Sequence, residues 1–175
     1  MLWVLAGMAC ASSSSVTSVR DPHYTGLMHA IVVAVGAGGT DATYPERLAA
    51  HLQADLARHR VVSTARIIRQ GTVNQKDLMA LVERAKPEGV LALRIAHGIA
   101  KRGVPMVLTY EATLLDTKQG DRIWNARIDV RRATGVDGTT DEFMSEVASQ
   151  VVQRLAVDRL IEPAVAQSNA AGNSS

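Results

Sequence analysis

Three apolar runs separated by two segments of helical periodicity constrain the fold of this chain more than any other feature. Residues 29–35 read His-Ala-Ile-Val-Val-Ala-Val, and mostly apolar runs also span residues 61–68 and 90–96. Continuous β-branched runs of this length are typical of strands buried on both faces of a parallel sheet. Around residues 45–60 and 74–85, apolar side chains recur at helical spacing. The alternation predicts parallel strands joined by right-handed helical crossovers.

The pattern then changes to an antiparallel hairpin over residues 105–132. If Leu114 lies opposite Trp124, the apolar side chains of both strands share one face. Glu111 then faces Arg127 on the other face, as an opposite-charge pair. A slip by one residue would mix the two faces, so this register is expected. We also expect Trp124 to be the largest buried side chain of the domain.

The charges of the hairpin predict how its two strands are placed. The strand at residues 122–132 carries several charged side chains, Arg127, Asp129 and Arg131. Charges on an edge strand oppose pairing with another chain, so this strand is expected to be a protected edge of the sheet. The strand at residues 105–115 is then internal. Self-association through the polar side chains of this region would weaken with added salt.

A final helix completes the domain. Thr139 and Glu142 form a capping box, and an apolar stripe runs from there to about Ile161. The fold class is thus α/β, one domain over residues 28–163 with the order β-α-β-α-β-β-β-α. Its mixed sheet has three parallel strands plus the antiparallel hairpin and packs with three helices.

Cys10, the single cysteine, is the most informative residue near the start of the chain. It follows an apolar stretch and precedes Ala11 and four serines, which resembles the lipid-attachment site of bacterial lipoproteins. By that resemblance residues 1–9 are a truncated signal-like leader, and Cys10 carries the lipid. Residues 10–27 are rich in Ser, Thr and Gly and are expected to form a flexible tether. Residues 164–175 are expected to form a disordered tail.

Composition argues against several classes of function. The net charge is +2, the basic residues are scattered, and aromatic residues make up only 3%. Nucleic-acid binding, which needs a basic stripe with stacking aromatics, is therefore not expected. The five histidines show no metal-ligand spacing, and no nucleophile motif is present, so we expect no metal, no cofactor and no enzymatic activity.

Four polar features are left as candidate contacts with a ligand or partner. The loop Gly36–Asp41 follows the first apolar run but lacks the third glycine of a dinucleotide-binding loop. Arg94 and His97 follow the third run, and Arg127 lies in the hairpin. A solvated strand end also explains Arg94 and His97. The alternative function is a small-ligand-binding protein or enzyme that uses the Gly36–Asp41 loop with Arg94 and His97.

One motif resembles a known group of proteins. The run Leu114 to Gly120 followed by Ile123 and Trp124 resembles the Leu-x-Asp-x-x-x-Gly turn and Ile/Val-Trp strand of small bacterial envelope lipoproteins. This group includes PelC, CsgG, LpoB and the N-terminal domain of TolB, and the likeness spans roughly residues 28–160. It implies a non-enzymatic scaffold on the periplasmic face of the outer membrane, attached to the membrane through Cys10. Envelope proteins and further copies of the chain would be its partners.

Overall fold

The computed structural model describes residues 13–37, 43–69, 75–101, 104–131 and 140–164. Cys10, the expected leader and all but the first residue of the expected tail lie outside the described residues. Within the described part there are six strands and three helices. In chain order they are β1 (Ser13–Arg20), β2 (Ala30–Ala37), α1 (Thr43–Arg58), β3 (Val62–Arg69), α2 (Gln75–Ala85), β4 (Gly89–Lys101), β5 (Val104–Asp116), β6 (Arg122–Arg131) and α3 (Thr140–Val157).

The strands form one mixed sheet in the order β1-β6-β5-β4-β2-β3. β2 lies between β3 and β4 and is parallel to both. β4, β5, β6 and β1 are each antiparallel to the next. This confirms the predicted α/β class, with three parallel strands, an antiparallel hairpin and three helices.

One strand of the sheet, β1, was not predicted, and it corrects the expectation of a flexible tether over residues 10–27. Ser13–Arg20 pairs with β6 in an unbroken antiparallel register, from Ser13 opposite Arg131 to Arg20 opposite Trp124. Its serines gave the segment the composition of a linker. Of its inward residues only Val16 packs against the apolar core, while Ser14 and Ser18 bond polar side chains of α3. The apolar alternation that identifies a half-buried strand is therefore missing.

The register of the hairpin is confirmed, but its expected edge is wrong. Leu114 lies opposite Trp124 and Glu111 lies opposite Arg127. β5 is internal, as predicted, since it lies between β4 and β6. β6 is not an edge, because β1 covers it. The edges of the sheet are β1 and β3.

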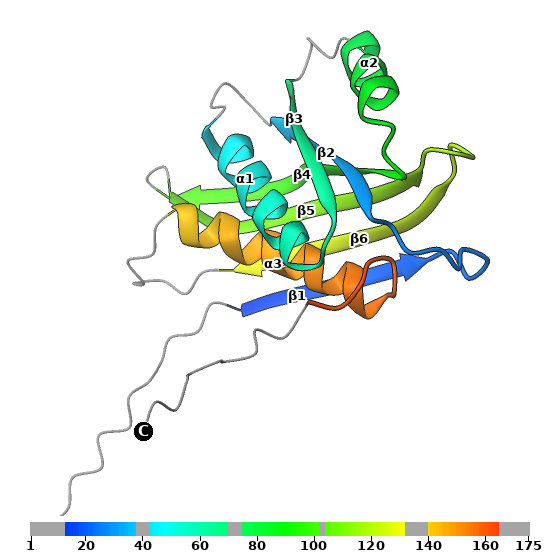
Figure 1. Ribbon diagram of the computed structural model, residues 1–175. Helices are drawn as coiled ribbons and strands as arrows, with labels where there is room; N and C mark the ends of the chain where they lie inside the picture. Colours follow the sequence, from blue (N-terminus) through cyan, green and yellow to red (C-terminus); the bar gives the residue numbers. More distant parts are fainter. Residues whose placement is uncertain (1–12, 38–42, 70–74, 102–103, 132–139, 165–175) are drawn as a thin grey trace, which may run out of the picture.

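The main core lies between one face of the sheet and the helices α1 and α3, which lie side by side on that face (Figure 1). Trp124 is 1% exposed and is the largest of the fully buried side chains, as predicted. α3 ends at Val157, before the expected Ile161. The backbone at Arg159 has a φ of 56°, which leaves the helical region and stops the helix.

The opposite face is only partly covered. There Val32, Ala34 and Val90 form a small apolar cluster, against which Leu81 and Val82 of α2 pack. β3 was expected to be buried on both faces, but Val62 is 74% exposed and the strand has a neighbour on one side only. The run at residues 61–68 contains Ser63, Thr64 and the exposed Arg66, which fits the edge position of β3.

Candidate functional site

The part of the sheet that faces away from α1 and α3 bears polar side chains from four strands, and we call it the polar face. Strand pairing and the alternation of side chains place them there. Trp124 and Tyr110 point toward the helices, so the residues next to each of them along its strand point to the opposite face. Its members are Ser13, Ser15 and Thr17 of β1, Asn125, Arg127, Asp129 and Arg131 of β6, Thr109, Glu111 and Thr113 of β5, and Arg94 and His97 of β4.

All three of the single residues predicted as contacts lie on this face. Glu111 of β5 is the centre, because Arg94 is its partner on β4 and Arg127 is its partner on β6. The Arg94 guanidinium donates a hydrogen bond to the Glu111 carboxylate. Arg127 instead pairs with Asp129 of its own strand, with 3.2 Å between Nε and Oδ2. The sheet therefore spaces two arginines on either side of one carboxylate.

His97 reaches the polar face through a bulge. The register between β4 and β5 shifts between Ile95 and His97, and His97 then lies opposite Thr109. β4 continues to Lys101, so His97 is within the strand and not at a solvated strand end. The bulge, which a regular alternation would not reveal, is what aims this side chain.

Asp129 is a member of the site that sequence reasoning did not select. The Thr109 hydroxyl donates a hydrogen bond to its Oδ1, and this bond, with smaller contributions from Arg127 and Arg131, lowers the pKa of the carboxyl below its usual value. Thr109 itself is 2% exposed. The same register that pairs Glu111 with Arg127 also pairs Thr109 with Asp129, so the signal was present in the sequence.

The Gly36–Asp41 loop is described only at its start. Gly36 and Ala37 end β2, and the rest of the loop lies outside the described residues. A methyl group on Gly36 would lie 3.3 Å from the Leu93 carbonyl oxygen and 3.6 Å from Cβ of Arg94. The structure therefore brings the beginning of this loop next to Arg94.

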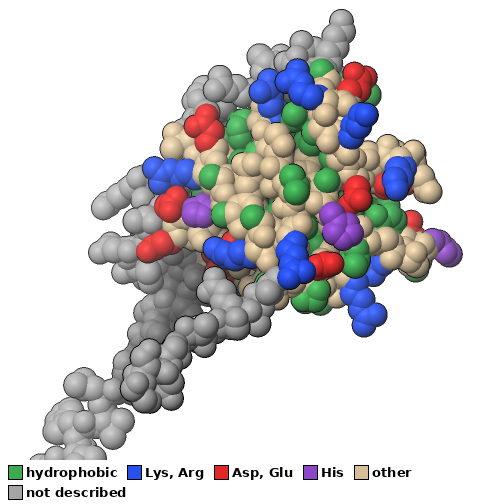
Figure 2. All heavy atoms as spheres, viewed as in Figure 1, with side chains coloured by type: hydrophobic (Ala, Val, Ile, Leu, Met, Phe, Trp, Pro, Cys, Tyr) green, Lys and Arg blue, Asp and Glu red, His purple; other side chains and the backbone are tan. Residues whose placement is uncertain are grey.

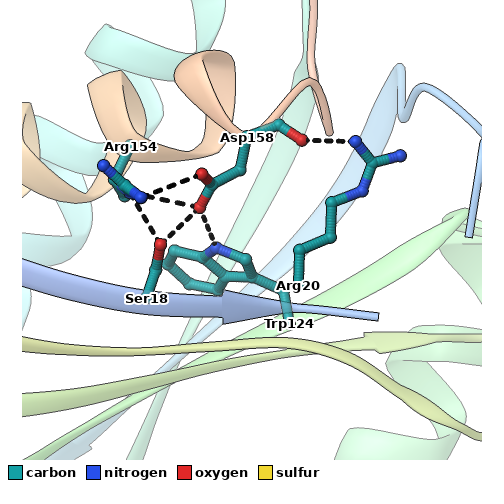
Figure 3. Close-up of polar contacts among 5 residues, drawn as sticks. All are labelled: Ser18, Arg20, Trp124, Arg154 and Asp158. Atoms are coloured by element: carbon teal, nitrogen blue, oxygen red, sulfur yellow. Dashed lines mark hydrogen bonds and ion pairs between the residues drawn. The ribbon is translucent and has the colours of Figure 1, made fainter. Parts of the chain in front are cut away.

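A second polar cluster, which we call the polar seam, joins β1 and β6 to the end of α3 (Figure 3). Oδ2 of Asp158 accepts hydrogen bonds from Trp124 Nε1 at 2.7 Å, from Ser18 Oγ at 2.5 Å and from Arg154 Nε at 3.2 Å. Arg20 donates to the backbone carbonyl of Asp158 at 2.7 Å. This cluster is not visible in the sequence, because its members come from β1, β6, α3 and the segment after α3.

The polar seam continues along β1 toward the start of α3. Ser14 Oγ donates to Glu146 at 2.9 Å and accepts from Gln150 at 2.9 Å. The inward side chains of β1 thus bond α3 at both ends of the strand. These contacts are structural, since they satisfy polar groups that the packing of β1 on α3 takes from water.

Other features of the described residues add no further site. A small hollow lined by Ser13, Ser14, Ser15, Asp129 and Arg131 lies at the β1 margin of the polar face. Among the described residues no group of His, Cys, Asp and Glu could hold a metal ion. No described helix has the length and apolar composition needed to cross a membrane. On the helix-bearing face shown in Figure 2, acidic and basic side chains are interspersed.

Comparison with known proteins identifies the fold but no family. No family model and no curated protein matches the chain. Among solved structures it resembles a point variant of the PelC dodecamer from Paraburkholderia phytofirmans, with a TM-score of 0.53 and 17% identity over 81% of this chain and 98% of that chain. A second PelC dodecamer from the same organism aligns with a TM-score of 0.52 and 17% identity, covering 86% and 100% of the two chains. The chain thus has a PelC-like fold.

Proposed function

We propose that this protein is a non-enzymatic accessory or scaffold component of a bacterial cell-envelope assembly or export system. The observation that carries the proposal is the fold shared with PelC, which extends over 98% of the PelC chain. A polar face assembled from four strands is a surface suited to protein contacts. Arg94 and Arg127 are already paired with carboxylates, and such surfaces contribute orientation and specificity more than affinity.

The proposal includes a lipid on Cys10 that holds the protein on the periplasmic side of the outer membrane. Its support is the apolar stretch before Cys10 and Ala11 after it. Stable anchoring needs more than one acyl chain, which a lipoprotein cysteine provides. Membrane fractionation and palmitate labelling of the wild type and Cys10→Ala test it. We expect label and membrane attachment in the wild type alone, and equal solubility of both proteins would refute the anchor.

The proposal also includes assembly into a homo-oligomer. Both PelC structures are of dodecamers, and this resemblance is the support. Sedimentation velocity of full-length Cys10→Ala, which removes any lipid-driven association, measures the assembly directly. We expect species larger than a monomer at micromolar concentration. A monomer across the whole concentration range would refute this part of the proposal while leaving the anchor untouched.

One observation favours a second candidate function, the binding of a small ligand. Gly36 lies against Arg94, so the start of the Gly36–Asp41 loop and the arginine adjoin. His97 lies on the same polar face, opposite Thr109. Thermal unfolding with a panel of anionic metabolites, compared between the wild type and Arg94→Ala, tests it. A shift in midpoint that the variant loses would support binding, and no shift would argue against it.

A further inference from the structure

The two edges of the sheet differ in how they are protected from pairing with another strand. Exposed edges are normally blunted by charge, proline or bulges. β1 has none of these between Ser13 and Val19: the segment reads Ser-Ser-Ser-Val-Thr-Ser-Val, and its register with β6 has no shift. In the described part of the chain nothing lies beyond β1 in the sheet. Val19 is 65% exposed.

The other edge is guarded. Arg66 of β3 is exposed and places a charge in the middle of that strand. The side-chain amide of Gln53, from α1, donates to the backbone carbonyl of Ser63 at 3.1 Å. A side chain therefore already uses a backbone group of β3. Of the two edges, β1 is the one left open to a partner strand.

We propose that β1 pairs with β1 of a second copy in an antiparallel arrangement with a two-fold axis at Val16. This rests on the homo-oligomer part of the proposed function and names the surface that would form it. Joining like edges gives a two-fold contact that closes after two copies and that larger assemblies with two-fold axes can contain.

The sequence of β1 fits this pairing residue by residue. The uncharged stretch from Ser13 to Val19 is symmetrical about Val16, so no charge meets a like charge across the axis. Ser15 would lie opposite Thr17 of the second copy, and their hydroxyls can bond across the strands. Because the axis passes through a residue, inward side chains stay inward. The two polar faces would then form one continuous surface.

Single cysteines test the register in full-length protein that also carries Cys10→Ala. At the axis, Val16→Cys would place two thiols on directly opposite residues, about 4.5–5.5 Å apart at Cα, which permits a disulfide. Val19→Cys is the matched control, since its two copies would lie about 20 Å apart along the strands. Under mild oxidation we expect a disulfide dimer from Val16→Cys and none from Val19→Cys. Random collisions would favour the more exposed Val19.

A second pair of variants tests the same contact independently, in case Val16→Cys does not fold. Lysine at both Ser15 and Thr17 opposes like charges across the axis, whereas Ser15→Glu with Thr17→Lys opposes unlike ones. Circular dichroism first establishes that both are folded. We expect the dissociation constant of the first to exceed that of the second by roughly tenfold or more, since each unlike pair is favourable and each like pair unfavourable. Unlike the salt-sensitive self-association expected from the charges of β6, which β1 covers, the wild-type contact should change little with salt, because β1 has no charge at the contact.

The outcomes separate this inference from the proposed function. An oligomer in sedimentation without the Val16→Cys disulfide, or with equal disulfide from Val19→Cys, overturns the β1 contact but not the homo-oligomer. Equal dissociation constants for the two charge variants would also overturn it. A monomeric protein would overturn both. An oligomer with a disulfide only from Val16→Cys supports both.

Discussion

The two faces of β5 and β6 are made by alternate residues of the same strands, yet their chemistry is opposite. Toward the helices, Tyr110 and Trp124 are 2% and 1% exposed and pack in the main core. Away from the helices, the Glu111 and Arg127 side chains are 39% and 60% exposed and form ion pairs. The buried contacts that determine stability therefore lie on the helix side, and the polar face stays available for the protein contacts proposed above.

The polar seam is intermediate between the two. It lies on the helix side, but there Ser18 of β1 bonds Arg154 of α3 and Asp158 just after it through side-chain hydrogen bonds. Substitutions on the three surfaces should therefore rank by how much buried contact each removes.

The largest effect is expected at Trp124. Trp124→Ala removes the largest buried side chain and should lower the free energy of unfolding by about 3–5 kcal/mol. Trp124→Phe keeps an aromatic ring but loses the N–H that bonds Asp158, and should cost less, about 1–3 kcal/mol. Urea denaturation measures both. A wild-type midpoint for the alanine variant would contradict the assignment of stability to the helix side.

Asp158→Ala should come next, at about 2–3 kcal/mol, because it leaves the Trp124 N–H and the Ser18 hydroxyl without their acceptor. Asp158→Asn is the matched control, since its side-chain oxygen can still accept a hydrogen bond, and should cost about half as much. Chemical denaturation again supplies the numbers. Equal losses from both variants would mean that the charge of Asp158, and not its hydrogen bonds, holds the polar seam.

A smaller, pH-dependent effect is expected at Asp129 on the polar face. The folded state lowers the pKa of this carboxyl, so its stabilising contribution is complete above its unfolded pKa and is lost as pH falls through the folded pKa. Asp129→Asn should therefore be less stable than the wild type near neutral pH, by under about 1 kcal/mol. The difference should close in acid. A pH-independent difference in unfolding midpoint would show that the lowered pKa has no part in it.

The smallest effect is expected at Arg94. Its ion pair with Glu111 is exposed, and such pairs contribute about 0–1 kcal/mol. Arg94→Ala should thus leave thermal stability almost unchanged, and the double variant with Glu111→Ala should show little coupling. A loss as large as that of Asp158→Ala would break the contrast between the two faces.

The sequence predicted those parts of the fold in which apolar side chains follow a regular period. The strand–helix alternation, the pairing of Leu114 with Trp124 and the burial of Trp124 were all readable, because each depends on one hydrophobic repeat. β1 was not readable, since Ser14 and Ser18 face inward and are satisfied by side chains of α3. A contact of this kind leaves no periodic trace in the strand itself.

The same limit applies to the polar face. Arg94, His97 and Arg127 could be selected as polar residues in apolar surroundings, but their convergence depends on strand order, which the sequence did not determine. The position of His97 also depends on a bulge in β4. The position of β6 inside the sheet depends on its pairing with β1.

The pairing of β1 with β6 has a consequence for the order in which the chain can fold. β1 is the first strand to be synthesised, but its partner β6 is the last, and α3, which bonds its inward side, comes later still. Contacts between such distant segments form slowly, because the loop between them must close first. The sheet therefore cannot be completed during synthesis until β6 and α3 have left the ribosome. Until then β1 stays without its partner strand.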